Sequence, residues 1–320
     1  NIGSAKLIDG GNGDDEILGR NVTNTWTING TDAGAVGVTG GLAYITSFTD
    51  IQTLIGGSFA DVFEINAEIT KSIQSGDGNN IFYVNTNVKQ LQGGKDRDQF
   101  IFGASGSADS VNGGDGVNSI NARDVDNVWS ITSSNAGDIR TATNNNYVKS
   151  FSNIQELNGG KAADIFYINA AATNIFGNEG ADTFVFNQSN DGSAVLIDGG
   201  DGLDILSGKN QRTTWGMTGP NTGNLSTSNS VYVTTFVDIN SLAGGTAEDV
   251  LAANNQANTW KINNTNEGTL QATTTPANII SFSGMENLLG SQAVDLFTFA
   301  TNGNITGLID GGSSATKTTI

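Results

Sequence analysis

The side chains best suited to bind a ligand in this sequence are aspartates that flank tight glycine turns. The segment from Leu196 to Leu206 reads L-I-D-G-G-D-G-L-D-I-L, and a related turn lies near the N-terminus. Glycine permits positive φ at such bends, and carboxylate oxygens are the ligands that Ca²⁺ prefers. The pattern therefore predicts candidate Ca²⁺ ligands at Asp9, Asp15, Asp198, Asp201 and Asp204.

The same aspartates also fit a purely structural role. An Asp side chain in a turn can accept backbone N–H groups of its own bend, as in an Asx-turn. A column of stacked carboxylates would repel itself unless cations or hydrogen-bond donors lay between its members. The sequence therefore leaves two interpretations open for these turns, a structural corner and a Ca²⁺ site.

Residues for catalysis are scarce. The chain has no His and no Cys, which removes most schemes based on a general base, a nucleophile or a transition metal. Paired carboxylates on a β-helix could cleave a polysaccharide, but every acidic position here recurs with the repeat and no acidic cluster is unique. We therefore predict that the protein is not an enzyme, with a polysaccharide-degrading β-helix enzyme as an alternative.

The amino-acid composition excludes several classes of binding partner and of fold. A net charge of -18 argues against nucleic acid and anionic membrane surfaces and leaves room for cations. No segment approaches 18 consecutive apolar residues, so no membrane-spanning helix is predicted. The chain holds 43 Gly and only 14% charged residues, and it shows no apolar stripe of helical period. Short β-rich runs such as Ile81 to Val84 recur instead, which favours an all-β fold.

A repeat organises the whole chain. Its glycine turns recur at intervals of about 20 or about 46 residues. Four residues after the second position of each turn comes an acid or amide, and two residues further on the position is always apolar. The acid or amide column is Asp15, Asp61, Asn80, Asp98, Asn118, Asp164, Asp182, Asp204, Asp249 and Asp295.

This repeat predicts stacked coils. Period-2 alternation around a fixed turn indicates two short strands per coil, each paired with the equivalent strand of the next coil. A unit of about 20 residues cannot bury its apolar face alone, so neighbouring units must stack into a solenoid. We predict a right-handed parallel β-solenoid, with one inner column formed by Phe63, Ile65, Ile73, Phe82, Val84, Leu91, Phe100 and Phe102.

The long units have their own pattern and span 11–57, 114–160, 200–245 and 245–291. Each carries a Trp 15 residues after its first turn and a Phe nine residues before the next. We interpret the segment between them as an additional coil plus a β-hairpin or loop extruded from one face, with the Trp and the Phe packed where this excursion leaves and rejoins. We expect residues 1–320 to form one continuous solenoid, a piece of a longer repeat protein.

The turns resemble the Ca²⁺-binding nonapeptide of the repeats-in-toxin family, G-G-x-G-x-D-x-U-x. The segments from Gly199 to Leu206 and from Gly10 to Ile17 match it fully. The resemblance implies a β-roll-like solenoid and possible Ca²⁺ binding as the only cofactor. The motif occurs here once per coil, whereas the family's rolls carry tandem nonapeptides. The long Gly/Asn/Thr-rich tracts also resemble large bacterial surface adhesins and filamentous-haemagglutinin-type proteins.

The function expected from these features is structural. We predict a secreted, extracellular component of a bacterial cell-surface stalk, filament or adhesin. Its partners would be neighbouring repeats or subunits of the same protein, with surface glycans as a further possibility and neither nucleic acid nor membrane insertion. The alternative is a carbohydrate-binding module that uses Trp26, Trp129, Trp215 and Trp260.

Overall fold

The structure is a computed structural model that describes residues 3–186, 191–273 and 279–312. Within those ranges the chain forms strands and turns and no helix, and the strands assemble into two sheets of 17 and 16 members. The described residues accordingly contain no helix of the length and apolarity needed to cross a membrane. The all-β, largely parallel architecture predicted from the repeat is confirmed.

The first sheet contains β1 (Ile8–Asp9), β3 (Asn24–Gly30), β4 (Ala33–Val38), β5 (Ala43–Thr49), β7 (Val62–Ile65), β9 (Ile81–Val84), β11 (Gln99–Phe102), β13 (Ser119–Asn121), β17 (Glu156–Gly160), β19 (Ala171–Asn178), β21 (Ser193–Asp198), β23 (Thr214–Gly219), β24 (Thr222–Ser226), β25 (Val231–Val237), β27 (Val250–Ala252), β31 (Asn287–Leu289) and β33 (Ile309–Asp310). The second sheet contains β2 (Glu16–Leu18), β6 (Thr53–Ile55), β8 (Ser72–Gly76), β10 (Asn87–Gly94), β12 (Ser107–Gly114), β14 (Asn127–Ser133), β15 (Ala136–Thr141), β16 (Asn146–Ser152), β18 (Ile165–Ile168), β20 (Thr183–Val185), β22 (Ile205–Ser207), β26 (Ser241–Ala243), β28 (Asn258–Asn264), β29 (Glu267–Ala272), β30 (Ile279–Ser283) and β32 (Asp295–Phe299).

Two compact units divide the chain. Unit 1 comprises residues 1–129 and 134–160, and unit 2 comprises residues 130–133 and 161–320. Each unit has the same construction, in which strands of the two sheets alternate along the sequence. Each unit can therefore be understood from its own coils.

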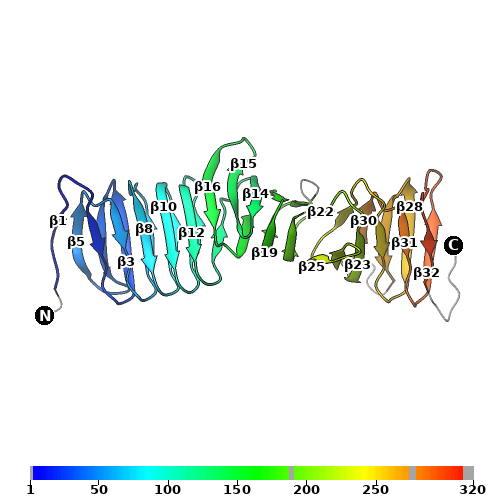
Figure 1. The fold of residues 1–320 in the computed structure, drawn as a ribbon, viewed down its shortest axis with the longest axis horizontal. Helices are drawn as coiled ribbons and strands as arrows, with labels where there is room; N and C mark the ends of the chain where they lie inside the picture. The colour runs from blue at the N-terminus through cyan, green and yellow to red at the C-terminus, as the bar shows by residue number, and fades with distance from the viewer. Residues whose placement is uncertain (1–2, 187–190, 274–278, 313–320) are drawn as a thin grey trace. The chain divides into compact units, whose positions relative to one another are not determined.

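Each short repeat is one coil with one strand in each sheet. In unit 1, β8, β10 and β12 lie side by side in the second sheet, while β9, β11 and β13 pair in the first (Figure 1). The pairing is parallel and in register, so that Phe63 faces Phe82 and Phe82 faces Phe100. Identical positions of successive repeats are therefore neighbours in space.

The interior of unit 1 is a column of aromatic rings. Phe63 stacks on Phe82 at 5.0 Å between ring centroids, and Phe82 stacks on Phe100 at 4.6 Å. All eight residues predicted for the inner column are buried, with exposed fractions of 0 to 3%. Because the side chains of a strand alternate between its two faces, the same pattern places polar residues such as Glu64 outside the column.

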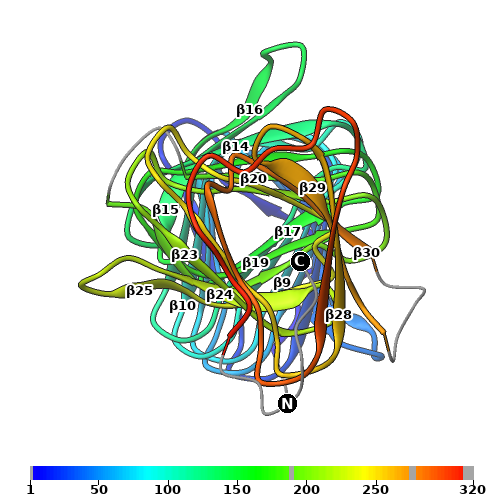
Figure 2. The same ribbon diagram turned by 90° about the vertical axis from the view of Figure 1, so that its right-hand side faces the viewer.

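The long units differ from the sequence prediction. The predicted additional coil is present, since β5 pairs in parallel with β1 and β3 pairs in parallel with β7. The hairpin is not fully extruded, because β4 lies antiparallel between β3 and β5 within the sheet. The reason is that all three strands need backbone partners, and the sheet edge supplies them. Only the hairpin tips project, as Figure 2 shows beside β16.

These three-stranded meanders alternate between the sheets. The first and third, β3–β5 and β23–β25, lie in the first sheet, and the second and fourth, β14–β16 and β28–β30, lie in the second. Five strands, β2 to β6, separate the turn at Asp15 from the turn at Asp61. Because five is odd, the glycine turn before a long unit leads into a strand of one sheet, and the glycine turn after it leads into a strand of the other.

The Trp and Phe residues of the long units lie where the sequence predicts. Trp26 begins the meander, Phe48 ends it, and the two rings meet edge to face at 6.5 Å. Trp260 and Phe282 make the same contact at 6.1 Å. In addition, Trp26 stacks on Phe63 at 5.7 Å, so the Trp is a member of the inner aromatic column.

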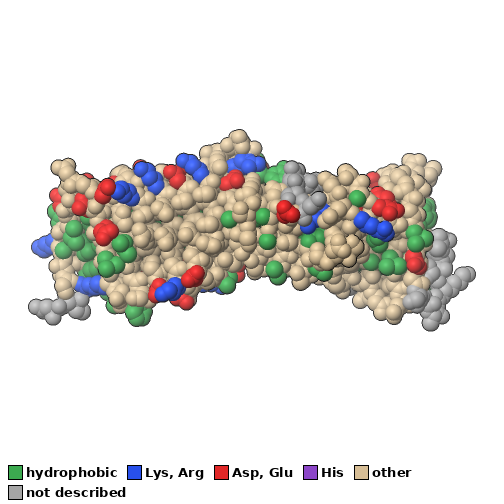
Figure 3. All heavy atoms as spheres, viewed as in Figure 1, with side chains coloured by type: hydrophobic (Ala, Val, Ile, Leu, Met, Phe, Trp, Pro, Cys, Tyr) green, Lys and Arg blue, Asp and Glu red, His purple; other side chains and the backbone are tan. Residues whose placement is uncertain are grey.

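The face of the molecule seen in Figure 3 carries few charged side chains. Figure 3 shows single Asp, Glu, Lys and Arg side chains dispersed over a face that is mostly backbone and uncharged polar groups. Several charged pairs connect different coils: Lys95 pairs with Asp77 of the preceding coil at 3.1 Å, and Arg97 pairs with Glu156, two coils further on, at 2.7 Å. These pairs are partly exposed, so each contributes about 0–1 kcal/mol.

Candidate metal-binding turns

In most turns the first residue is a glycine because the backbone is crowded there. A Cβ added to Gly93 would clash with the carbonyl oxygen of Gly113 in the next coil and with Oδ2 of Asp98. The same kind of clash arises at Gly199, against the carbonyl oxygen of Asp238. The first glycine is therefore required because the next coil and the turn's own aspartate both approach it closely.

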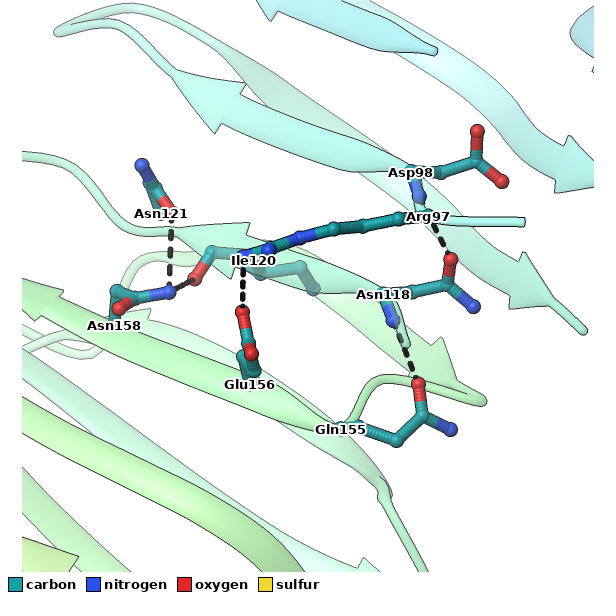
Figure 4. Close-up of polar contacts among 8 residues, drawn as sticks. All are labelled: Arg97, Asp98, Asn118, Ile120, Asn121, Gln155, Glu156 and Asn158. Atoms are coloured by element: carbon teal, nitrogen blue, oxygen red, sulfur yellow. Dashed lines mark hydrogen bonds and ion pairs between the residues drawn. The ribbon is translucent and has the colours of Figure 1, made fainter. Parts of the chain in front are cut away.

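The acid or amide of each turn forms a ladder that connects the coils. Its backbone N–H donates to the side-chain oxygen of the equivalent residue in the following coil. Figure 4 shows two successive steps, from Asp98 to Asn118 and from Asn118 to Gln155. In unit 1 the rungs are Asn24, Asp61, Asn80, Asp98, Asn118 and Gln155, at donor–acceptor distances of 2.7, 2.7, 3.0, 2.9 and 2.8 Å.

Unit 2 repeats the ladder in shorter runs. One run connects Asp164, Asp182, Asp204 and Asn240 at 2.7, 2.8 and 2.8 Å. Another connects Thr213, Asp249 and Glu286 at 2.8 and 2.8 Å. Most of these side chains are completely buried, and a buried polar group costs free energy unless it is hydrogen-bonded. The ladder meets that cost for one carboxylate oxygen of each aspartate.

The second side-chain atom distinguishes two kinds of turn. In the first kind Oδ2 accepts the backbone N–H of the residue four positions earlier, as Asp98 does from Gly94 at 3.0 Å. Asp61, Asp249 and Asp295 accept in the same way at 2.9, 2.7 and 2.6 Å. The residue four positions earlier does not have left-handed φ in any of these four turns.

In the second kind of turn the residue four positions earlier has left-handed φ. Gly76 has φ of 82°, and the amide of Asn80 donates to the carbonyl oxygens of Gly76 and Gly78 at 3.3 and 2.8 Å. Four aspartates occupy turns of this kind, after Gly11 (φ 75°), Gly160 (φ 133°), Asn178 (φ 74°) and Gly200 (φ 82°). In Asp15, Asp182 and Asp204 the buried Oδ2 has no hydrogen-bond partner among the described residues.

The predicted ligands are brought together only in part. Asp204 is completely buried, and Asp198 and Asp238 lie close enough to raise its pKa further above what burial alone produces. Burial also raises the pKa of Asp198, with Asp238 adding to the effect. Asp201 is exposed on the far side of the bend, where its backbone N–H donates to the carbonyl oxygen of Asn178 at 2.6 Å.

The N-terminal turn has the same layout. Asp9 accepts the backbone N–H of Gly11 at 3.1 Å, as Asp198 does from Gly200. The N–H of Asp15 donates to Oε1 of Gln52 at 2.8 Å. Its buried Oδ2 has no hydrogen-bond partner among the described residues. Asp9 and Asp15 therefore correspond to Asp198 and Asp204.

An orphaned buried carboxylate oxygen fits a bound cation. Among the described residues, however, no three His, Cys, Asp or Glu side chains gather closely enough to hold a metal ion. A Ca²⁺ ion at Asp204 or Asp15 would therefore draw most of its six to eight ligands from backbone carbonyls and water. The donor set is suited to Ca²⁺ in kind, because every candidate ligand is oxygen.

The acid or amide column predicted from the sequence does not include the ladder residues of the long units. Asn24, Asn127, Thr213 and Asn258 start the meanders, and Gln52, Gln155, Asn240 and Glu286 follow them. The signal was present, because each of the first group precedes a Trp by two residues and each of the second precedes a Leu by two. Without a glycine pair before them, these positions do not stand out from the Asn- and Thr-rich background.

Comparison with known proteins found no match to this chain in two searches. No protein-family model matches the chain, and a search of curated proteins gives no significant match.

The two kinds of turn predict opposite effects for the same substitution. In excess EDTA, Asp204→Asn should raise stability by about 0.5–1.5 kcal/mol, because the new amide can donate to turn carbonyls as Asn80 does. Asp98→Asn should lower it by about 1–3 kcal/mol, because an N–H₂ group would then face the N–H of Gly94. Urea unfolding measures both, and shifts of the same sign would contradict the two-class description.

Acidification should stabilise the fold. Burial raises the pKa of Asp98 and of Asp249 to about 6. The folded state therefore binds these protons more tightly than the unfolded state, whose aspartates have a pKa of about 3.9. The resulting stabilisation is complete below the unfolded pKa and is lost as the pH rises through about 6. The melting temperature should therefore increase as the pH is lowered from 7.5 to 5. A decrease over the same range would refute the raised pKa values of Asp98 and Asp249.

Proposed function

We propose that this chain is a structural segment of a secreted bacterial cell-surface stalk, filament or adhesin. The observation that carries the proposal is the unbroken six-rung side-chain ladder of unit 1, from Asn24 to Gln155. A ladder that connects six neighbouring coils, in addition to the backbone pairing, serves stiffness rather than a localised reaction. Stiffness is the property that a stalk requires.

The parallel pairing supports assembly with further repeats or subunits. In a stack of coils every strand except those at the ends has backbone partners on both sides. A strand at a sheet edge presents unpaired N–H and C=O groups, which are a template for another strand. The proposed partners are therefore neighbouring repeats or subunits of the same protein.

The proposal includes Ca²⁺ as a stabilising ion at the turns of Asp204 and Asp15. Support comes from their orphaned, buried Oδ2 atoms and from the acidic neighbours Asp198 and Asp238. The ion would neutralise carboxylates that repel each other, and it has no catalytic part.

Thermal melts in EDTA and in millimolar CaCl₂ test the calcium part. Wild type should melt a few degrees higher with Ca²⁺, because a ligand that binds only the folded state stabilises it. Asp204→Asn should reduce the shift, whereas Asp98→Asn should retain it, since Oδ2 of Asp98 is already paired with Gly94. Identical melts of wild type in the two buffers would remove Ca²⁺ from the proposal and leave the structural function intact.

The carbohydrate-binding alternative loses the basis that the sequence gave it. Trp26, Trp129, Trp215 and Trp260 all have exposed fractions of 0%, so their rings are not available to stack on a sugar. The polysaccharide-degrading alternative has no specific support, since the buried aspartates other than Asp32 recur with the glycine turns and form no separate cluster. Turnover on acidic glycans remains its direct assay.

Surface labelling tests the proposed location. An antibody against the folded segment should label intact cells of the native host without permeabilisation, and external protease should remove the label. An antibody against a cytoplasmic protein provides the control. Labelling that appears only after permeabilisation would contradict the cell-surface function.

A further inference from the structure

A polar pocket lies on the second sheet of unit 1, where β10, β12 and β16 are neighbours. Its volume is about 400 Å³, within the range of about 300–1,000 Å³ that small-molecule sites occupy. The hairpin that leads into β16 covers one side of it and projects beyond the adjoining turns (Figure 2). The lining includes Asn87, Ser107, Asp109, Arg123, Asn145 and Lys149.

The unusual member of this lining is Arg123, which is only 9% exposed. Its guanidinium lies over the ring of Tyr147, 4.1 Å from the ring centroid. Nε donates to the carbonyl oxygen of Gly106 at 2.9 Å, and Nη2 donates to the same oxygen. A guanidinium has five N–H donors, so three remain after these two bonds.

The charge of Arg123 has no acidic partner among the residues that the structure describes: the ion pairs of this region join other residues, such as Lys149 with Asp109. Burial consequently lowers the pKa of Arg123. The equivalent cation of the third meander, Lys209, stacks on Tyr232 at 4.3 Å but has Asp191 nearby to favour its charge. A buried charge without an opposite charge costs several kcal/mol, and an external anion would offset that cost.

The remaining lining groups suit hydroxyl groups better than a second charge. Lys149 at the rim is paired with Asp109 at 2.6 Å, so its charge is already matched. Ser107 donates to Oδ1 of Asn87 at 3.0 Å, Nδ2 of Asn87 donates to Oε1 of Glu68 at 3.3 Å, and Asn145 belongs to the lining on the hairpin side. Amides and hydroxyls both donate and accept hydrogen bonds, as sugar hydroxyl groups require.

We propose that this pocket binds an acidic sugar, a hexuronate unit whose carboxylate pairs with Arg123. The guanidinium fork matches a carboxylate in geometry, while the amide of Asn145 and the second lone pair of Oδ1 of Asn87 hydrogen-bond the ring hydroxyls. The inference does not rest on the stalk function, since the pocket belongs to unit 1 whatever the chain does on a cell.

Isothermal titration of the whole chain with D-glucuronate tests the proposal, with D-glucose and acetate as the two partial ligands. Glucuronate should bind at least about 10-fold more tightly than either, because a charge-assisted hydrogen bond contributes about 1.5–3 kcal/mol. Glucose binding as tightly as glucuronate would overturn the role of Arg123. Acetate binding as tightly would overturn the assignment to a sugar.

Three variants locate the site. Arg123→Gln should weaken glucuronate binding at least about 10-fold. Arg20→Gln is the matched control, because Arg20 stacks on Tyr44 at 3.9 Å in the first meander; it should leave binding unchanged. Asp109→Asn should strengthen binding, because it removes a negative charge from the lining and releases Lys149 toward the ligand.

Thermal melts of Arg123→Gln and Arg20→Gln, compared with each other, distinguish a loss of glucuronate binding from a loss of folding. Should Arg123→Gln unfold, Asp109→Asn still decides, since its ion pair is largely exposed and contributes little to stability. Unchanged or weakened glucuronate binding in Asp109→Asn, or no heat from wild type at millimolar glucuronate, would refute the proposal.

Discussion

The hydrogen bond from the backbone N–H of one Asx residue to the side chain of the next is the interaction on which this fold depends. It occurs at the bend, where the strand ladder has ended and backbone groups would otherwise lie buried without partners. Because each rung uses the side chain of the following coil, a turn is satisfied only when its neighbour is in place. The bends are thereby as cooperative as the strands.

The ladder also explains why the carboxylates tolerate burial. In Asp61, Asp98, Asp182, Asp204 and Asp249 one oxygen accepts from the adjacent coil, and the other accepts the turn's own N–H wherever that group points inward. In turns with left-handed φ at Gly11, Gly160, Asn178 or Gly200 that N–H does not donate to the buried Oδ2, and there the carboxylate lies in a place that an amide satisfies better. A cation or a proton is the natural complement of such an oxygen.

The meanders impose a second constraint, on how many strands each of the two sheets contains. Each adds three strands to one sheet, and their alternation between the sheets brings the final numbers to 17 and 16. Their odd strand count also exchanges the positions of the glycine turns. The pocket at Arg123 is a by-product of this insertion, because the hairpin before β16 stands beside β12 with a cation-on-tyrosine pair at its base.

The sequence by itself determined the coil, the inner column around Phe82 and the Asx column around Asp98, because a fixed repeat places equal residues in equal environments. It also placed Trp26 against Phe48. Only the tertiary structure decided that the long units join the sheets, that Gln52 and Asn24 continue the ladder, and that Arg123 lacks an acid. The reason is physical: repetition is local information, whereas strand partners and charge partners depend on which segments of distant sequence meet.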